Sequence, residues 1–434
     1  MKPETKNRTP WLWIPTLYFA EGIPYFIVNN ISVLMFAKMG VPNGEMALFT
    51  SLLYLPWTIK PLWSPFVDII RTKRWWILSM QVLMSVVLVV MALTLARPTS
   101  QMIDHGETPM SLFTLTLVLF IVTAFASATH DIAADGFYML GLSGKDQSFY
   151  VGIRSTFYRL SNIFGQGVLV AIAGHIETEY DDVPLSWTVT LGVAAVLFTL
   201  VTLYHFLAVP KVERQEESDV TAFSVILGFI RSFATFFTKD GVLLAIAFML
   251  LYRLPEAFLL KLCTPFLVAS PDVGGLGMAT QDVGLAYGTI GVIFLTLGGI
   301  VGGIMASRWG LRKSLWPMAA CMTLPCLSFV YLAAFQPGDM IVISTCIAIE
   351  QFGYGFGFTA YMLYMMHFAD GEFKTSHYAI CTAFMALSMM LPGMVAGYIQ
   401  EWLGYENFFW MVMVCCVATV VVTALVVKKL KKKI

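Results

Sequence analysis

Ionisable side chains recur inside segments that are otherwise apolar, and they are the residues of this sequence best placed to do chemistry. They comprise five acids and five bases: Glu21, Asp131, Asp135, Glu256 and Glu350, with Lys60, Arg154, Arg159, Arg253 and Lys261. A single charge at the centre of a membrane helix costs on the order of 3 kcal/mol. Ten charges are therefore tolerated only if they pair with one another or border a wet passage. The equal numbers of acids and bases permit pairing.

Two of the acids share one face of a predicted helix. Asp131 and Asp135 are four residues apart, which is close to one helical turn. Arg154 enters the following apolar segment at a comparable depth and is the expected partner. Two carboxylates held close together in a low dielectric repel each other when both are ionised, an arrangement that suits a proton carrier. A structural ion-pair network that ties this helix to Arg71 or Arg74 explains the same residues, and the sequence leaves both readings open.

The sequence gives little support to a metal-binding site or to nucleophilic catalysis. The six histidines are scattered, without an HxxxH motif or a Ser/His/Asp grouping, and the seven cysteines lie in apolar stretches without a CxxC motif. His130 precedes the acidic pair and is either a hydrogen-bonded packing residue or a proton relay. We therefore expect that the protein is not an enzyme and that it has no catalytic residues, no cofactor and no metal site.

The elements that position these charges must be membrane spans. The 434 residues are 58% hydrophobic and 12% charged, and their mean hydropathy is +0.75, far from the range of soluble domains. Lys+Arg and Asp+Glu both number 27, so no net basic field favours nucleic acid as a partner. The first apolar run contains Glu21 and lacks a cleavage site, which indicates a retained span. Windows of about 19 residues predict twelve spans, near 12–37, 46–67, 75–96, 111–139, 149–175, 186–208, 241–268, 282–306, 314–335, 340–367, 377–400 and 407–427.

Loop charges predict the orientation. Twelve spans place both termini on one side, and the loops on that side hold nearly all the lysine and arginine residues. The opposite side has only Lys38 and Arg97 and is rich in acids. The positive-inside rule therefore predicts cytoplasmic termini in a multi-pass protein of the inner membrane.

The long cytoplasmic connection predicts the domain organisation. Within residues 209–240, apolar residues recur at helical spacing, which indicates an amphipathic helix lying on the inner membrane surface. We expect an all-α membrane protein with a six-helix bundle at 1–208, the linker at 209–240 and a second six-helix bundle at 241–434.

Two spans carry helix-breaking residues at corresponding depths. Gly22 and Pro24 interrupt the first span about ten residues in, and Pro255 interrupts the seventh at a similar depth, near the bilayer midplane. Matching interruptions in two halves are a sequence pointer to a transport site. Proline kinks that membrane helices simply tolerate are the alternative.

Two short basic loops carry a recognisable pattern. Residues 302–313 read GGIMASRWGLRK, which resembles the glycine-rich basic loop motif of the major facilitator superfamily. Residues 63–74, after the second span, keep the acid and the bases but lose the glycines. These side chains can clamp helix ends and hold one conformation closed on the inside, or they can be ordinary positive-inside anchors. The gating candidates are Asp68, Arg71, Arg74, Arg154, Arg308 and Arg312.

A narrower resemblance covers roughly residues 18–165. The runs KPLWSPFVD (60–68), GIP (22–24), SATHDIAAD (127–135) and YRL (158–160) are similar in order and spacing to motifs of the AmpG muropeptide permeases. The acetyl-CoA transporters share parts of this pattern. The resemblance implies a monomeric carrier that imports anhydro-muropeptides, which are sugar–peptide products of cell-wall turnover, by proton-driven alternating access.

Matched motif positions, and the cavity-lining spans one, four, seven and ten of this superfamily, imply the site residues. The proton-coupling candidates are Glu21, Asp131, Asp135, Glu256 and Glu350. The candidates for binding a solute carboxylate, phosphate or sugar ring are Lys60, His130, Tyr158, Arg159, Arg253 and Tyr361. His130 stands where the family usually has glutamine, which leaves import of another oligosaccharide or sugar conjugate as the alternative. The expected partners are a small solute, protons and the lipid bilayer.

Overall fold

Hydropathy accounts for nearly all of the observed elements. The computed structural model describes residues 9–97, 109–142, 144–211 and 222–431. These residues contain helices and no strand, and eight of the helices are long and apolar enough to cross a membrane. Two of the eight, Thr280–Phe335 and Ser376–Leu430, each cover two predicted spans. The two remaining predicted spans, 46–67 and 149–175, are built from consecutive shorter helices. The helices thus match the twelve predicted spans.

Contacts between Cα atoms divide the chain into two compact units. The first unit comprises residues 1–31 and 62–226, and the second comprises residues 32–61 and 227–434. The predicted six-plus-six division at residues 208 and 241 stays a prediction.

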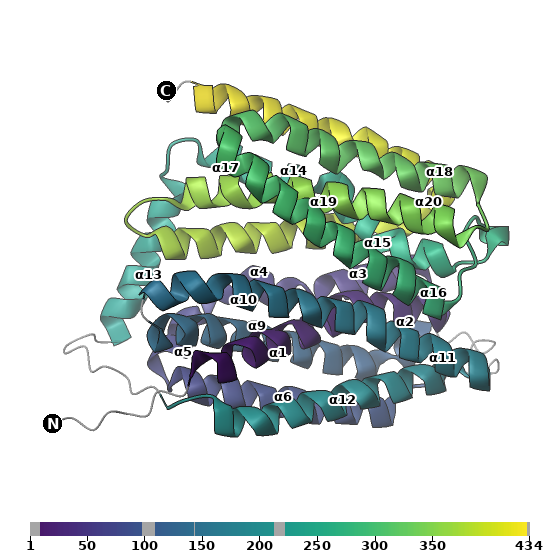
Figure 1. Ribbon diagram of the computed structural model, residues 1–434, viewed down its shortest axis with the longest axis horizontal. Helices are drawn as coiled ribbons and strands as arrows, with labels where there is room; N and C mark the ends of the chain where they lie inside the picture. The colour runs from purple at the N-terminus through teal and green to yellow at the C-terminus, as the bar shows by residue number, and fades with distance from the viewer. Residues whose placement is uncertain (1–8, 98–108, 143, 212–221, 432–434) are drawn as a thin grey trace. The chain divides into compact units, whose positions relative to one another are not determined.

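In the first unit, long helices lie side by side (Figure 1). Trp13, Tyr18 and Phe137 are buried in its hydrophobic core. The elements of this unit are η1 (Pro10–Leu12), α1 (Ile14–Phe26), η2 (Ile27–Ile31), α5 (Ser64–Ile69), α6 (Lys73–Thr94), α8 (Pro109–Leu112), α9 (Thr114–Gly141), α10 (Gly144–Asn162), η4 (Ile163–Leu169), α11 (Val170–Tyr180) and α12 (Val183–Ala208).

The second unit has a larger core, in which Phe248, Tyr252 and Tyr361 are fully buried. Its elements are α2 (Ser32–Lys38), α3 (Asn43–Leu52), α4 (Leu55–Ile59), α14 (Val242–Leu251), α15 (Leu254–Val268), η5 (Pro271–Val273), α16 (Thr280–Val283), η6 (Gly284–Gly291), α17 (Val292–Thr323), η7 (Leu324–Cys326), α18 (Leu327–Phe335), α19 (Met340–Ala369) and α20 (Lys374–Lys431). The short turn η3 (Lys60–Leu62) and the helix α13 (Ala222–Phe237) extend across the divisions between the units.

Many outward-facing side chains are apolar. On α12, Val196, Leu200 and Leu203 are exposed at helical spacing. A water-facing surface would not expose such a row on so many helices, whereas hydrocarbon solvates it well. The long helices are therefore membrane spans.

The predicted interruption is confirmed in the seventh span and displaced in the first. The seventh span breaks between α14 and α15, where Arg253 has a non-helical backbone conformation and Pro255 lies in the first turn of α15. The first span continues through Gly22 and Pro24 as α1, so the prediction of a break there was wrong. Proline removes one backbone donor, which a membrane helix can tolerate. The irregularity appears instead as a π-helical turn, η2, which directly follows α1.

Glycines allow α17 and α19 to pack closely. A Cβ atom at Gly298 would lie 2.9 Å from the backbone nitrogen of Phe356, and one at Gly302 would lie 3.0 Å from the carbonyl oxygen of Phe356. At Gly303, on the same helix, a Cβ atom would have no neighbour within 4 Å. The small-residue run therefore serves packing at some positions and not at others.

The predicted linker contains the helix α13, and its place at the membrane surface stays a prediction. Ser232 and Phe236 are buried, whereas the apolar side chains of Leu227, Ile230 and Phe237 are exposed. Its exposed face is thus partly apolar, as a helix at a membrane surface requires.

Two matched substitutions on α17 test this packing. We expect Gly298→Ala to destabilise the protein by about 1–3 kcal/mol, because the new methyl group meets the backbone of α19. Gly303→Ala should be neutral or stabilise by about 0.5–1 kcal/mol, because alanine restricts the unfolded chain and meets nothing. Thermal unfolding of the purified variants in detergent measures both effects. Equal stability of the two variants would contradict the close approach of these helices.

Candidate functional site

Three carboxyl groups of the first unit converge. One ligand oxygen from each of Glu21 on α1 and Asp131 and Asp135 on α9 lies within 4.8 Å of the other two. Glu21 is buried, whereas the two aspartates are partly exposed. The helical spacing of the aspartates places them together, and packing of α1 against α9 adds Glu21. Oxygen ligands at this spacing can hold a proton or a hard cation.

Arg154 is the basic partner of this cluster. Its Nη2 atom lies 2.8 Å from Oδ1 of Asp135, as the sequence predicted. The guanidinium also lies 4.3 Å from the ring centroid of Tyr18, whose hydroxyl donates a hydrogen bond of 3.2 Å to Asp135. Both side chains of the ion pair remain partly exposed. The site is therefore a water-accessible cluster of charged side chains and not a fully buried ion pair.

Arg159 continues along the same helix in a polar stripe. Ser155, Arg159, Asn162 and Gln166 follow each other at spacings of four, three and four, which keeps them near one face. The amide of Gln166 bonds the side chain of Asn162 and accepts a hydrogen bond of 3.2 Å from Asn30. Arg159 is exposed and makes no hydrogen bond or ion pair with the residues that the structure describes. A guanidinium in this position requires water or a solute anion.

His130 belongs to a separate buried network. Its Nε2 atom lies 2.9 Å from the amide nitrogen of Gln81, and the amide oxygen of Gln81 lies 3.0 Å from Nδ1 of His205. Nε2 of His205 lies 2.9 Å from the hydroxyl of Thr16. His130 is 1% exposed. The geometry favours the packing alternative for His130 over solute binding.

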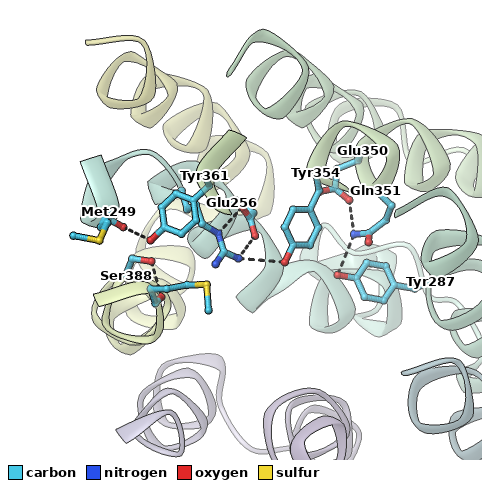
Figure 2. A network of polar contacts seen from close by, with 10 residues as sticks. Met249, Glu256, Tyr287, Glu350, Gln351, Tyr354, Tyr361 and Ser388 are labelled. Atoms are coloured by element: carbon cyan, nitrogen blue, oxygen red, sulfur yellow. Dashed lines mark hydrogen bonds and ion pairs between the residues drawn. The ribbon is translucent and has the colours of Figure 1, made fainter. Parts of the chain in front are cut away.

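In the second unit, Arg253 and Glu256 form a buried ion pair. The guanidinium donates two hydrogen bonds to Glu256, of 3.0 Å from Nε and 2.5 Å from Nη2, and one of 3.2 Å to the hydroxyl of Tyr354 (Figure 2). Tyr361 lies beside it, with its ring centroid 5.5 Å from the guanidinium carbon, and donates its hydroxyl proton to the carbonyl of Met249. The break of the seventh span provides the turn in which this pair forms. Each charge satisfies the other, so neither is held ready for a solute.

Glu350 lacks such a cation. It is 4% exposed and accepts a hydrogen bond of 2.7 Å from the amide of Gln351, which also donates to the hydroxyl of Tyr287 (Figure 2). No lysine, arginine or histidine pairs with it among the described residues. A buried carboxyl group in polar but uncharged surroundings is stable when it carries a proton.

The other predicted solute contacts are less defined. Lys60 is half-buried in the turn η3. The ring of Tyr158 lies 5.6 Å from that of Phe26 and 6.4 Å from that of Tyr25, so these aromatics form a small cluster between α1 and α10.

The basic loops contain one clear helix clamp. Arg74 donates hydrogen bonds of 2.9 Å and 2.8 Å to the carbonyls of Val209 and Phe206, which close the C-terminus of α12. Arg71 lies 5.9 Å from the ring centroid of Trp75, and Arg308 is exposed. The gating roles of these residues, including Arg312, stay predictions. The side chain of Asp68 lies outside the described residues.

Lys261, one of the ten charged residues inside the spans, has a hydrogen-bond partner that the sequence did not predict. It is buried on α15 and donates a hydrogen bond of 3.1 Å to the hydroxyl of Thr50 on α3. A lysine in an apolar span was a visible signal, but its partner is 211 residues away in the chain.

Comparisons with known proteins agree with this architecture. The model of the Major Facilitator Superfamily matches residues 16–380. Among curated proteins, the chain is 24% identical to the anhydromuropeptide permease of Escherichia coli strain K12, over 91% of this chain and 74% of that protein. It is also 24% identical to the putative transporter AmpG 4 of Rickettsia conorii, over 91% and 90% of the two chains.

Solved structures show the same fold at low sequence identity. The nucleoside transporter NupG superposes with a TM-score of 0.66 at 16% identity, over 96% of this chain and 97% of that chain. The D-xylose–proton symporter superposes with a TM-score of 0.66 at 13% identity, over 94% and 96%. The match to the family model covers well over half of the chain and is supported by these likenesses. The chain belongs to the major facilitator superfamily and is a multi-pass membrane transporter, not an enzyme.

Proposed function

We propose that this transporter imports anhydro-muropeptides across the cytoplasmic membrane and couples their uptake to protons by alternating access. The observation that carries the proposal is the cluster of Glu21, Asp131 and Asp135 beside Arg154, one helix turn before the exposed Arg159. The cluster can bind the coupling ion and Arg159 a solute anion. The similarity to the anhydromuropeptide permease of Escherichia coli supports this choice of solute.

Electrostatics favours a proton in the acidic cluster. Two like charges within 4.8 Å of each other repel by about 3 kcal/mol or more at an effective dielectric constant of 20. Three carboxylates and one guanidinium leave a net charge of −2, and one bound proton halves that charge. Because Asp131 and Asp135 are partly exposed, a proton can reach them from water.

The remaining candidate acids differ in suitability. Glu256 is engaged by Arg253 on both carboxylate oxygens. Releasing that bond would leave a buried guanidinium without its partner, which is costly. Glu350 has no such partner among the described residues and is the better second candidate for a proton site.

The polar stripe of α10 provides groups for a sugar–peptide solute. Such solutes carry carboxylates, amides and sugar rings. Arg159 offers a charged fork of donors for a carboxylate, Asn162 and Gln166 offer amides, and Tyr25 and Tyr158 offer aromatic faces. His130, the departure from the family pattern, is buried beside Gln81. That departure therefore gives little support to a different solute.

Alternating access also fits the composition of the second unit. Residues 32–61, from the first two spans, group with the last six spans, and α3 packs against α20. In our proposal this contact is the closed outer end of one transport state. The six-helix halves at 1–208 and 241–434, the linker at 209–240, the cytoplasmic termini and the monomeric state are parts of the same proposal.

We expect Asp131→Asn and Asp135→Asn to abolish accumulation of an anhydro-muropeptide driven by a pH gradient. An amide cannot carry the proton, whereas exchange of labelled for unlabelled solute needs no net proton movement and should persist. Proteoliposomes report both activities. Asp181→Asn is the matched control, because Asp181 is exposed and has a left-handed backbone conformation that asparagine adopts readily. Unchanged pH-driven accumulation in both variants would remove the proton-carrier assignment.

We expect Arg159→Gln to raise the apparent KM for an anhydro-muropeptide at least tenfold. The loss of a hydrogen bond to a charged group costs about 1.5–3 kcal/mol. Because Arg159 has no partner within the described protein, the variant should keep its melting temperature. Arg97→Gln is the control, since Arg97 is an exposed arginine of the same unit. An unchanged KM would contradict the assignment, and wild-type uptake of neutral oligosaccharides in place of muropeptides would favour the alternative solute class.

A further inference from the structure

The amine of Lys261 is buried with too few acceptors. Lys261 is 6% exposed. An ammonium group has three donors, and one of them reaches the hydroxyl of Thr50 at 3.1 Å. That hydroxyl gives its own proton to the carbonyl of Met46 at 2.6 Å. No carboxylate forms an ion pair with Lys261 in the described part of the chain, and Glu256, on the same helix, is held by Arg253.

A second polar group beside Lys261 also lacks a partner. The hydroxyl of Ser51 is fully buried and makes no hydrogen bond within the described structure. Ser51 and Lys261 meet at Gly393 of α20, where an added Cβ atom would lie 3.0 Å from Cε of Lys261 and 3.3 Å from Cβ of Ser51. The ring centroid of Tyr54 lies 5.8 Å from the amine. Glycine at position 393 therefore leaves room for this polar group of side chains.

Unused donors of a buried cation and an unused hydroxyl together indicate a missing acceptor. Burying a polar group without a partner destabilises a protein, and burying a charge does so more strongly. The acceptor that satisfies both groups is an anion with two oxygens, such as a carboxylate.

Access to this site requires that α3 separate from α15 and α20. In this structure α3 covers Lys261, whose amine donates a hydrogen bond to Thr50 of α3. Hydrogen bonds also join the first residues of α3 to α20. The amide of Asn43 donates to the amide oxygen of Gln400 at 2.7 Å, and the backbone N–H of Gly44 donates to Oε1 of Glu401 at 2.7 Å. Water can replace these polar contacts, so they can open and close reversibly.

We propose that Lys261, together with Ser51, is a second anion subsite that receives a carboxylate of the solute when α3 withdraws. This inference rests on the proposed function, in which the contact of α3 with α20 is the closed outer end. Lys261 then distinguishes solutes that carry an additional carboxylate from neutral ones. Thr50 and Tyr54 hold the amine while the site is closed.

Uptake by reconstituted protein tests the subsite. With an anhydro-muropeptide, Lys261→Met should raise the apparent KM at least tenfold, and Lys261→Arg should recover most of the affinity because it keeps the charge. With the same solute after amidation of its peptide carboxyls, wild type and Lys261→Met should have equal KM values. Lys374→Met is the control, since Lys374 is an exposed lysine of the same unit. Equal KM values of wild type and Lys261→Met for the acidic solute would overturn the subsite.

A binding measurement separates failure of the subsite from failure of the proposed function. If wild type imports no muropeptide, the proposed solute is wrong. The subsite is then decided by the melting temperature in N-acetylmuramic acid, which has a carboxylate, and in neutral N-acetylglucosamine. Stabilisation by the acid alone that Lys261→Met loses supports the subsite. The same response of wild type and variant to both sugars, or no response in either, overturns it.

Discussion

An ionised side chain inside a membrane span loses most of its hydration, and this cost governs how the polar residues of the protein are arranged. Arg253 and Glu256 offset this cost by forming an ion pair at the first turn of α15. Arg154 and Asp135 pair across two helices and stay partly in contact with water. Where full pairing is absent, as at Arg159, Glu350 and Lys261, the structure has groups that need a solute, a proton or water. At these positions, binding of a solute or a proton can change the equilibrium between transport states.

The irregular backbone serves this arrangement. The break between α14 and α15 lets Arg253 reach both Glu256 and Tyr354. The π-helical turn η4 directly follows α10 and contains Gln166, the last residue of the polar stripe, which accepts a hydrogen bond from Asn30. Widened turns leave backbone groups and side chains in positions that a regular helix would not allow. Regular spans support the structure, and irregular turns lie where polar contacts are needed.

Close packing supplies the rigid parts that a rocking mechanism requires. Gly298 and Gly302 let α17 and α19 approach within backbone contact. Between α3 and α20 glycine also allows backbone contact, since a Cβ atom at Gly397 would lie 2.7 Å from the backbone nitrogen of Gly44, and hydrogen bonds join the start of α3 to α20. Glycine packing alone therefore does not distinguish helix pairs that move as one body from pairs that separate.

The sequence by itself determined the helical membrane fold and the spans to within a few residues, and it placed Asp131 and Asp135 on one helix face with Arg154 as the expected partner. These follow from hydropathy, bilayer thickness and the period of a helix, which are all local properties. Only tertiary structure decided that Glu21 joins the acidic cluster, that Glu256 is held by Arg253, and that His130 bonds Gln81. It also displaced the irregularity of the first span beyond Pro24 and placed Lys261 beside residues of the second span. Each of these depends on which helix faces meet, and that choice is made by packing between segments far apart in the chain.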